Sequence, residues 1–260
     1  MKSLWTKFRN LQLVWKIVSV LALLGVLVMG ATLIYVKLIN DPPAKLTTSD
    51  LDAALSNTTP PTSKSAGTLV TSQPTASAPP NSSASSAGAD GTWNVTAASD
   101  LRYRVKEVLN GLDTEAVGKT NAITGSLTIA GTTASVADFT VDMNTFTSDE
   151  SQRDSSFRDR VMQVSQFPTG SFKLTKPIDF AKVPADGEKL TTTATGDLML
   201  HGVTKSVTFE LTATLSNGKI GILGNIPVLF SDYKIDNPSF AFVTTKDNGL
   251  LEFILVFEPA

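Results

Sequence analysis

Apolar residues alternate with polar residues through most of residues 91–260, and this alternation limits the possible folds more than any other feature of the sequence. A β-strand points successive side chains to opposite faces, so the pattern predicts strands with one buried and one solvated face. We therefore expect residues 91–260 to form a mainly β domain. The alternating apolar positions are Leu127, Ile129, Val136, Phe139, Val141, Met143, Phe172, Leu174, Leu198, Leu200, Val207, Phe209, Leu211, Ala213, Leu215, Ile226, Val228, Phe230, Leu251, Phe253, Leu255 and Phe257.

Turn-forming residues separate these runs. They include Ala130-Gly131, Ala185-Asp186-Gly187, Asn217-Gly218 and Asp247-Asn248-Gly249. Asn-Gly and Asp-Gly steps favour tight hairpins, because these residues adopt positive φ readily. The spacing predicts an antiparallel, meander-like sheet that is either closed into a barrel or folded into a sandwich.

One segment departs from the alternation and predicts a short helix. Ser148-Asp149-Glu150 can begin a helix, and Phe157, Val161 and Val164 recur at helical spacing. Gln166-Phe167-Pro168 would end it. This amphipathic helix is expected to pack over the mouth of a barrel or along its flank.

The last predicted strand, residues 250–257, is apolar on both faces, with Glu252 as its only charged residue. Such a strand faces an apolar interior on one side and packs beneath a helix or a second layer on the other. The interior is either a filled core or a cavity for a hydrophobic ligand, and composition does not separate these two possibilities.

Residues 17–36 form a run of twenty residues without a charge, preceded by four basic and no acidic residues in residues 1–16. This length spans a bilayer, and the basic head predicts a cytoplasmic N-terminus with the C-terminal domain outside, in the cell envelope. A secretory signal peptide cleaved near residues 28–31 is the alternative. We favour an uncleaved single-pass anchor, because the apolar run continues past that site.

Residues 37–90 are rich in Pro, Ser, Thr and Ala and lack apolar periodicity. A segment of this composition buries too little surface to offset the entropy of ordering. We therefore expect a disordered linker between the anchor and the domain.

The chain has no cysteine and a single histidine, His201, which restricts its chemistry. Disulfides, thiolate nucleophiles and cysteine or multi-histidine metal sites are excluded. Residues 91–260 carry 15 basic and 20 acidic residues, so a net charge of −5 argues against binding to nucleic acid. We expect neither a metal nor a cofactor, and no enzymatic activity.

Residues 198–209 read Leu-Met-Leu-His-Gly-Val-Thr-Lys-Ser-Val-Thr-Phe. They resemble the signature L-x-x-H-G-V-T-x-x-V-x-F of the YceI-like family of lipid- and polyisoprenoid-binding proteins. Residues 141–148, the Arg153-Asp154 step and residues 167–172 are similar to further family elements, so the resemblance covers residues 91–260. The chain departs from the family at residues 105–107, where many members carry a histidine, and after Asp154.

The resemblance implies an extended, lipocalin-like antiparallel barrel whose apolar pore holds a long isoprenoid chain, such as a polyprenyl phosphate or an isoprenoid quinone. Arg153 and His201 are candidates for contact with a headgroup, although Arg153 can instead pair with Asp154 and His201 can instead support a turn. The alternative function is a non-enzymatic envelope interaction module with a filled β core. The pore candidates are Phe139, Val141, Phe157, Phe167, Phe172, Leu198, Leu200, Phe209, Phe230 and Phe253.

Overall fold

The structure is a computed structural model that describes residues 2–34, 42–56, 88–240 and 243–260, with side chains from residue 15 onward. The strands are β1 (Gly91–Val95), β2 (Asp100–Leu109), β3 (Leu112–Thr120), β4 (Ile123–Ala130), β5 (Thr133–Asp142), β6 (Thr169–Lys176), β7 (Ile178–Asp179), β8 (Lys189–Leu200), β9 (Val203–Ser216), β10 (Lys219–Leu229) and β11 (Val243–Pro259). The helical segments are α1 (Lys2–Ile34), α2 (Thr48–Ser56), η2 (Met143–Thr145), α3 (Ser151–Ser156), η3 (Phe157–Val161) and η4 (Phe230–Tyr233). The expected mainly β domain is confirmed.

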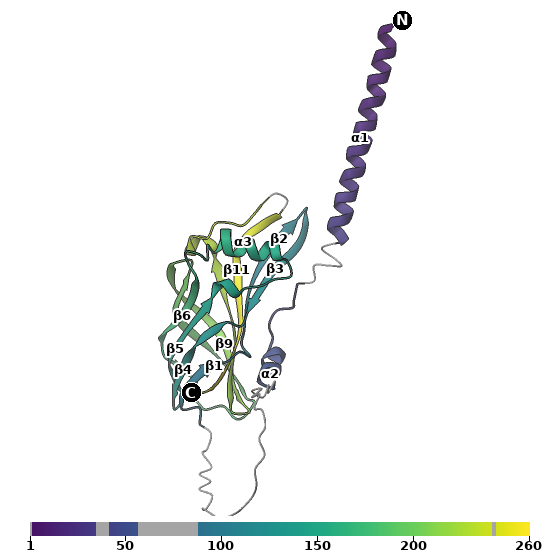
Figure 1. Cartoon of the computed structure of the whole chain (residues 1–260). Helices are drawn as coiled ribbons and strands as arrows, with labels where there is room; N and C mark the ends of the chain where they lie inside the picture. The colour runs from purple at the N-terminus through teal and green to yellow at the C-terminus, as the bar shows by residue number, and fades with distance from the viewer. Residues whose placement is uncertain (1, 35–41, 57–87, 241–242) are drawn as a thin grey trace, which may run out of the picture.

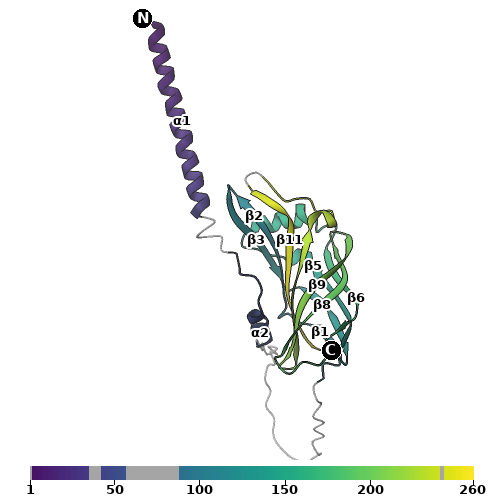
Figure 2. The same ribbon diagram turned by 180° about the vertical axis from the view of Figure 1, so that it is seen from behind.

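The sheet closes into an antiparallel barrel rather than folding into a sandwich. Strands β1, β4, β5, β6, β8, β9, β10 and β11 pair in this order, and the pairing of β11 with β1 completes the ring. Figures 1 and 2 show the strands wrapping around a common interior. A closed ring leaves no unpaired strand edge along its circumference, so its backbone groups are satisfied within the sheet.

The barrel is narrow at one end and splayed at the other, because β11 has two partners on one edge. Its last residues pair with β1, whereas residues 243–254 pair with β2. The β2–β3 hairpin therefore leaves the ring and extends to one end of the barrel, together with α3 and η4, which we call the mouth end (Figure 1). The opposite, far end carries the β9–β10 turn.

Of the two turns predicted at Asn217-Gly218 and at Asp247-Asn248-Gly249, one is present in the structure and the other is not. Asn217-Gly218 forms the β9–β10 hairpin turn, with φ angles of 53° and 71°, as predicted. The prediction of a turn at Asp247-Asn248-Gly249 is wrong: these residues lie inside β11, where the register with β2 shifts between Thr245 and Gly249. A bulge absorbs the extra residues, so the strand continues instead of reversing.

A second bulge changes which residues of β5 point into the barrel, so the inward face differs from the predicted one. The register with β4 shifts between Thr128 and Ile129, so the alternation changes phase near the start of β5. Ala134 and Ala137 are consequently buried, whereas Val136 is 48% exposed on the outer surface. The assignment of Val136 to the buried face is therefore wrong.

The predicted short helix is present as α3 followed directly by the π-helical turn η3. Phe157 and Val164 are buried, as their spacing indicated. The Asp154 carboxylate accepts hydrogen bonds from the backbone N–H and hydroxyl of Ser148, at 2.7 and 2.6 Å, which fixes the entry into the helix. This helix lies at the mouth end, across from the β2–β3 hairpin (Figure 1).

The prediction that residues 37–90 are disordered throughout is wrong for the helix α2. Thr47 and Asp50 cap its start reciprocally, since each side chain accepts a hydrogen bond from the other residue's backbone N–H, at 2.8 and 3.4 Å. The Thr47 hydrogen bonds also lower the pKa of the Asp50 carboxyl. Residues 57–87, the rest of the predicted linker, lie outside the described residues.

Helix α2 explains why both faces of β11 are apolar. Its Leu51 and Leu55 pack against Ile254 and Val256 on the outer face of β11, and all four side chains are buried. The expectation that the last strand packs beneath a helix is confirmed, but the helix comes from the segment expected to be a linker. The opposite face of the strand, which includes Phe257, lies in the barrel core.

The N-terminal helix α1 is long and apolar enough to cross a membrane between Trp15 and Ile34, where its mean hydropathy is 2.7. Residues 35 and 36, the end of the predicted span, lie outside the described residues. An anchor and a signal sequence both have this length and composition.

We expect Phe257→Ala to destabilise the barrel strongly, because Phe257 is fully buried where β11 closes the ring. A phenylalanine truncated in a packed core costs about 3–5 kcal/mol. Val136→Ala, at an exposed position, is the control and should change stability by less than about 0.5 kcal/mol. Urea unfolding of the full chain in detergent measures both; equal effects would contradict this description of the core.

Candidate functional site

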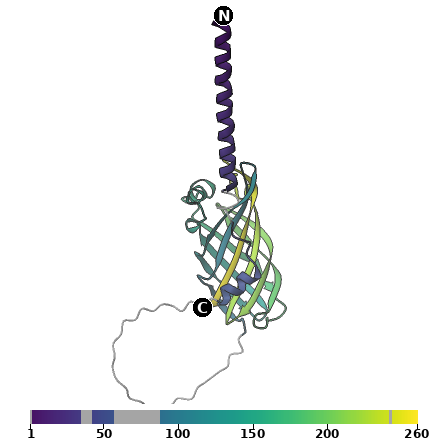
Figure 3. The same ribbon diagram turned by 90° about the vertical axis from the view of Figure 1, so that its right-hand side faces the viewer.

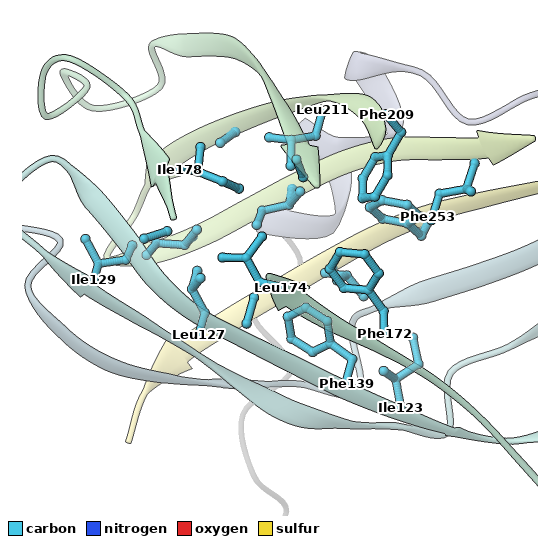
Figure 4. Close-up of a pocket in the computed structure, with 18 of the residues that line it drawn as sticks. Ile123, Leu127, Ile129, Phe139, Phe172, Leu174, Ile178, Phe209, Leu211 and Phe253 are labelled. Carbon is cyan, nitrogen blue, oxygen red and sulfur yellow. The ribbon is translucent and has the colours of Figure 1, made fainter. Parts of the chain in front are cut away.

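The inside of the ring contains an apolar cavity of about 160 Å³, which we call the barrel cavity. Aliphatic and aromatic side chains from opposite walls point into it in Figure 4. Among the described residues that line it, Lys182 is the only charged one. The labelled lining residues are Ile123, Leu127, Ile129, Phe139, Phe172, Leu174, Ile178, Phe209, Leu211 and Phe253. An apolar cavity of this size stays dry and favours an apolar occupant, as a cavity of roughly 150 Å³ that accepts benzene illustrates.

Glycines on neighbouring strands set the orientation of the large rings around this cavity. A Cβ atom at Gly196 would lie 2.4 Å from the ring of Phe172, and one at Gly224 would lie 2.5 Å from the ring of Phe253. The outer ends of the two rings therefore occupy the space that a side chain at each glycine would take. Phe209 contacts both rings edge-to-face, with centroids 5.5 and 5.8 Å apart, an arrangement that aromatic pairs prefer.

A second and larger cavity of about 820 Å³, the mouth cavity, lies at the mouth end. Strands β2, β3 and β11, helix α3 and the turn η3 contribute its walls. It adjoins the barrel cavity, because Met143, Phe146, Leu200 and Leu251 line both. The two cavities together give the barrel an apolar interior with a wide opening at one end.

Three aromatic rings form the lower wall of the mouth cavity. Tyr103 stacks on Phe157 with ring centroids 4.8 Å apart, and Phe146 contacts both rings. Burial raises the pKa of the Tyr103 hydroxyl far above its usual range, so the phenol is neutral at physiological pH. The ring cluster joins helix α3 and the turn η3 to the barrel and keeps this wall apolar.

Charged side chains lie farther out in the mouth cavity. Glu107, Glu150, Arg153, Asp159 and Arg160 all line it. Arg153 forms an ion pair with Asp149 one helical turn earlier, and its side chain is 18% exposed. Burial raises the pKa of the Glu107 carboxyl, although the positive charge of Arg153 opposes this effect. The site is thus apolar inside and charged at its opening.

The structure places seven of the ten predicted pore residues around the barrel cavity: Phe139, Val141, Phe172, Leu198, Leu200, Phe209 and Phe253. Phe157 and Phe230 line the mouth cavity instead. Phe167 lines neither cavity, because its ring packs edge-on against His201, with centroids 4.5 Å apart. Of the two headgroup candidates, Arg153 lines the mouth cavity and His201 lines neither.

His201 supports a hairpin turn. It has a φ of 49° and Gly202 one of 71°, which gives the tight turn between β8 and β9. Its Nδ1 lies 3.1 Å from the carbonyl oxygen of Tyr233. A carbonyl only accepts, so Nδ1 carries the hydrogen, while the buried Nε2 has no hydrogen-bond partner among the described residues. This geometry favours the role in a turn over contact with a headgroup.

Sequence reasoning missed most of the mouth cavity and the small residues of the barrel wall. Tyr103, Val105 and Leu109 lie on β2, which the alternation did not identify as a pore strand. Ala137 and Ala194 line the barrel cavity, but alanine carries little pattern signal. The alternation of Leu101, Tyr103 and Val105 is the pattern in the sequence that could have identified β2 as a strand with an inward apolar face. Within the described part of the chain, no three His, Asp or Glu side chains gather as a metal site.

Comparisons with known proteins agree with this fold. The sequence profile of a family described as YceI-like domain matches residues 93–257. A solved polyisoprenoid binding domain from Saccharophagus degradans, implicated in plant cell wall breakdown, is similar with a TM-score of 0.54 and 18% identity, over 65% of this chain and 98% of that one. Burkholderia cenocepacia BcnA gives a TM-score of 0.49 and 18% identity, over 62% and 98%. No curated protein matches the sequence.

We expect His201→Ala to destabilise the domain, because alanine is strained at a positive φ and leaves the Tyr233 carbonyl without its donor. The cost should be about 1–3 kcal/mol. His201→Asn is the control, since asparagine tolerates this backbone conformation and should lose less stability. Thermal unfolding measures both variants; an alanine variant as stable as the wild type would refute this role.

We also expect Glu107→Gln to stabilise the protein at neutral pH. Burial raises the folded-state pKa of Glu107 above its unfolded value, so its carboxylate opposes folding increasingly as the pH rises through these two values. The variant should unfold at a higher temperature than the wild type at pH 7, and the difference should vanish below about pH 4. Glu210→Gln, on the exposed face of β9, is the control. A gain that does not depend on pH would contradict the burial effect.

Proposed function

The chain belongs to the YceI-like domain family, and from this premise we propose that it is a membrane-anchored protein that binds a long-chain isoprenoid lipid outside the membrane. The observation that carries the proposal is the apolar barrel cavity, which continues into the wide mouth cavity. The similar fold of a domain described as polyisoprenoid binding supports the ligand class. Polyprenyl phosphates and isoprenoid quinones both fit this class.

The shape and chemistry of the two cavities suit an elongated ligand with one polar end. The apolar tail would lie in the barrel cavity among rings such as Phe172 and Phe209. Burying a few hundred Å² of apolar tail at roughly 25 cal/mol per Å² contributes several kcal/mol before ordering costs. This binding needs shape and dryness, which the family fold provides, rather than reactive groups.

The polar end of the ligand would lie in the mouth cavity. Arg153 lines this cavity, and its planar guanidinium suits the oxygens of a phosphate. Glu107, on β2, lines the same cavity and would repel an anionic group in its charged form. A quinone head is neutral and would depend less on either side chain.

We infer that α1 anchors the protein in the membrane, with residues 1–16 in the cytoplasm and the barrel outside. Support comes from the apolar segment between Trp15 and Ile34 and from the basic residues that precede it. The barrel then lies where lipid precursors of the cell envelope and quinones are within reach. The role of the barrel is binding and holding the lipid rather than catalysis.

Native mass spectrometry of the full chain, extracted from its own host membrane, tests this function. We expect a co-purifying lipid with an isoprenoid tail, and we expect added polyprenyl phosphate or quinone to raise the unfolding temperature of lipid-free protein. Arg153→Gln should weaken the effect of the phosphate more than that of the quinone. Absence of both a bound lipid and a thermal shift would refute the proposal.

A variant that fills the cavity separates binding inside the barrel from binding to its surface. Ala194 is buried and lines the barrel cavity, so Ala194→Phe should abolish lipid retention and the thermal shift. Val136→Phe adds a ring of the same type on the exposed outer surface and should retain both. Equal lipid binding by the two variants would place the ligand outside the barrel.

A further inference from the structure

Residues 42–56, which follow the N-terminal helix by a short interval, are bound along the outside of the barrel; we call them the strap. Nη2 of Arg104 donates to the carbonyl of Pro43 at 2.7 Å, and Nη1 of Arg102 donates to the carbonyl of Ala44 at 3.4 Å. Beneath this segment, Arg104 pairs with Glu252 at 3.1 Å, and their side chains are only 4% and 3% exposed. The start of the strap is thus held by side chains of β2.

Helix α2, the helical part of the strap, packs closely on the barrel wall. Leu51 and Leu55 contact Ile254 and Val256, and a Cβ atom at Gly221 would lie 2.8 Å from Leu51 and 2.9 Å from Leu55. A side chain at that position of β10 would force the two leucines to shift. An ion pair of 2.9 Å between Asp52 and Lys189 adds a polar contact.

The strand register gives the direction of the strap. Arg104, which holds Pro43, lies opposite Leu250, about midway along β11. Val256, which contacts α2, lies opposite Gly221, near the far end. The strap therefore enters at the mouth side and runs toward the far end, and Figures 1 and 3 show α2 low on the barrel with α1 leaving at the mouth end.

This direction limits where the membrane can lie. Ile34 ends α1, and Pro42 begins the described strap, so the intervening chain spans no more than about 29 Å even when fully extended. In addition, Nδ2 of Asn110, in the β2–β3 turn, donates to the hydroxyl of Thr32 at 2.9 Å. Thr32 lies near the end of the apolar span of α1, which is where a membrane-spanning helix meets the interface.

The rim of the mouth cavity carries an exposed aromatic residue. Phe240 lines this cavity, and 68% of its surface is exposed. The guanidinium of Arg160 lies 5.4 Å from its ring centroid and also donates to the carbonyl of Pro238 at 2.8 Å. An aromatic ring with an adjacent arginine is the combination that membrane–water interfaces favour.

We propose that the strap fixes the mouth of the barrel against the outer face of the bilayer that α1 spans, with the Phe240 rim in the interface. The proposal rests on the proposed anchor and lipid ligand, and it adds the route: the lipid passes between the bilayer and the mouth cavity without crossing water. Because the domain is net acidic, the tether rather than electrostatic attraction holds it there, so a zwitterionic membrane suffices. The partner that the Phe240 rim contacts is thus the lipid surface itself.

The absence of native cysteine allows a site-specific test in the full chain. Phe240→Cys and, on the outer surface toward the far end, Val136→Cys receive a nitroxide label after reconstitution into phosphatidylcholine nanodiscs; Val136 is likewise exposed and apolar, and it lines neither cavity. Electron paramagnetic resonance compares collisions with oxygen, which partitions into lipid, and with a water-soluble nickel chelate. The label at 240 should collide mainly with oxygen and the label at 136 mainly with nickel. Equal nickel accessibility at both sites would overturn the proposal.

A strap variant tests the cause of this orientation. Leu51→Asp with Leu55→Asp should release α2 while leaving the barrel core intact, since these leucines belong to a separate cluster. The label at 240 should then become as accessible to nickel as the label at 136. Ser49→Asp with Ala53→Asp adds the same charges to exposed positions of α2 and should leave the label in the interface. If release of the strap leaves Phe240 in lipid, the strap does not orient the mouth.

The same samples distinguish the two proposals. A chain that fails to enter nanodiscs would refute the anchor, and with it the orientation. A chain that enters nanodiscs and retains its lipid, but whose label at residue 240 is as accessible to nickel as the label at residue 136, would refute only the orientation. The strap variant without a label substitution, solubilised in detergent, should still bind lipid, because Leu51 and Leu55 line neither cavity.

Discussion

The double pairing of β11 is the constraint on which the rest of the structure depends. Its far-end residues close the ring with β1, and its mouth-end residues carry the β2–β3 hairpin away from that ring. One long strand therefore produces both a sealed barrel and a splayed opening. Where β1 and β11 pair, the ring has no free edge, whereas β3 pairs with β2 alone among the named strands.

The cavity is a consequence of where small and large residues meet on this closed sheet. Gly196 and Gly224 leave room for the rings of Phe172 and Phe253 against the wall, and Ala137 and Ala194 add little bulk. Space therefore remains along the axis. The outer face of β11 is also occupied, because Leu51 and Leu55 cover Ile254 and Val256 while Glu252 pairs with Arg104. The same strand thus contributes to the barrel cavity on one face and holds the strap on the other.

Much of the fold was predictable from local pattern, and the exceptions have physical reasons. Alternation and the Asn217-Gly218 turn predicted the antiparallel sheet, and seven of ten pore candidates line the barrel cavity. Val136 was misassigned because a bulge changes the phase of alternation, which no local pattern reveals. Phe167 has the size of a pore residue, but it packs on His201 instead. Helix α2 was not predicted because Leu51 and Leu55 are buried only through their contact with Ile254 and Val256, about 200 residues later in the chain.

By itself, the sequence determined the class of the domain, the apolar N-terminal segment and the lack of cysteine chemistry and of multi-histidine metal sites, because periodicity, length and composition are local properties. Only the tertiary structure decided that the sheet closes, that the interior keeps a cavity open at one end, and that residues 42–56 lie on the barrel wall. These features depend on contacts between residues far apart in the chain, such as Arg104 with Pro43 and Phe257 with Val95. Such contacts depend on strand register and on the fit of facing side chains, which no local pattern encodes.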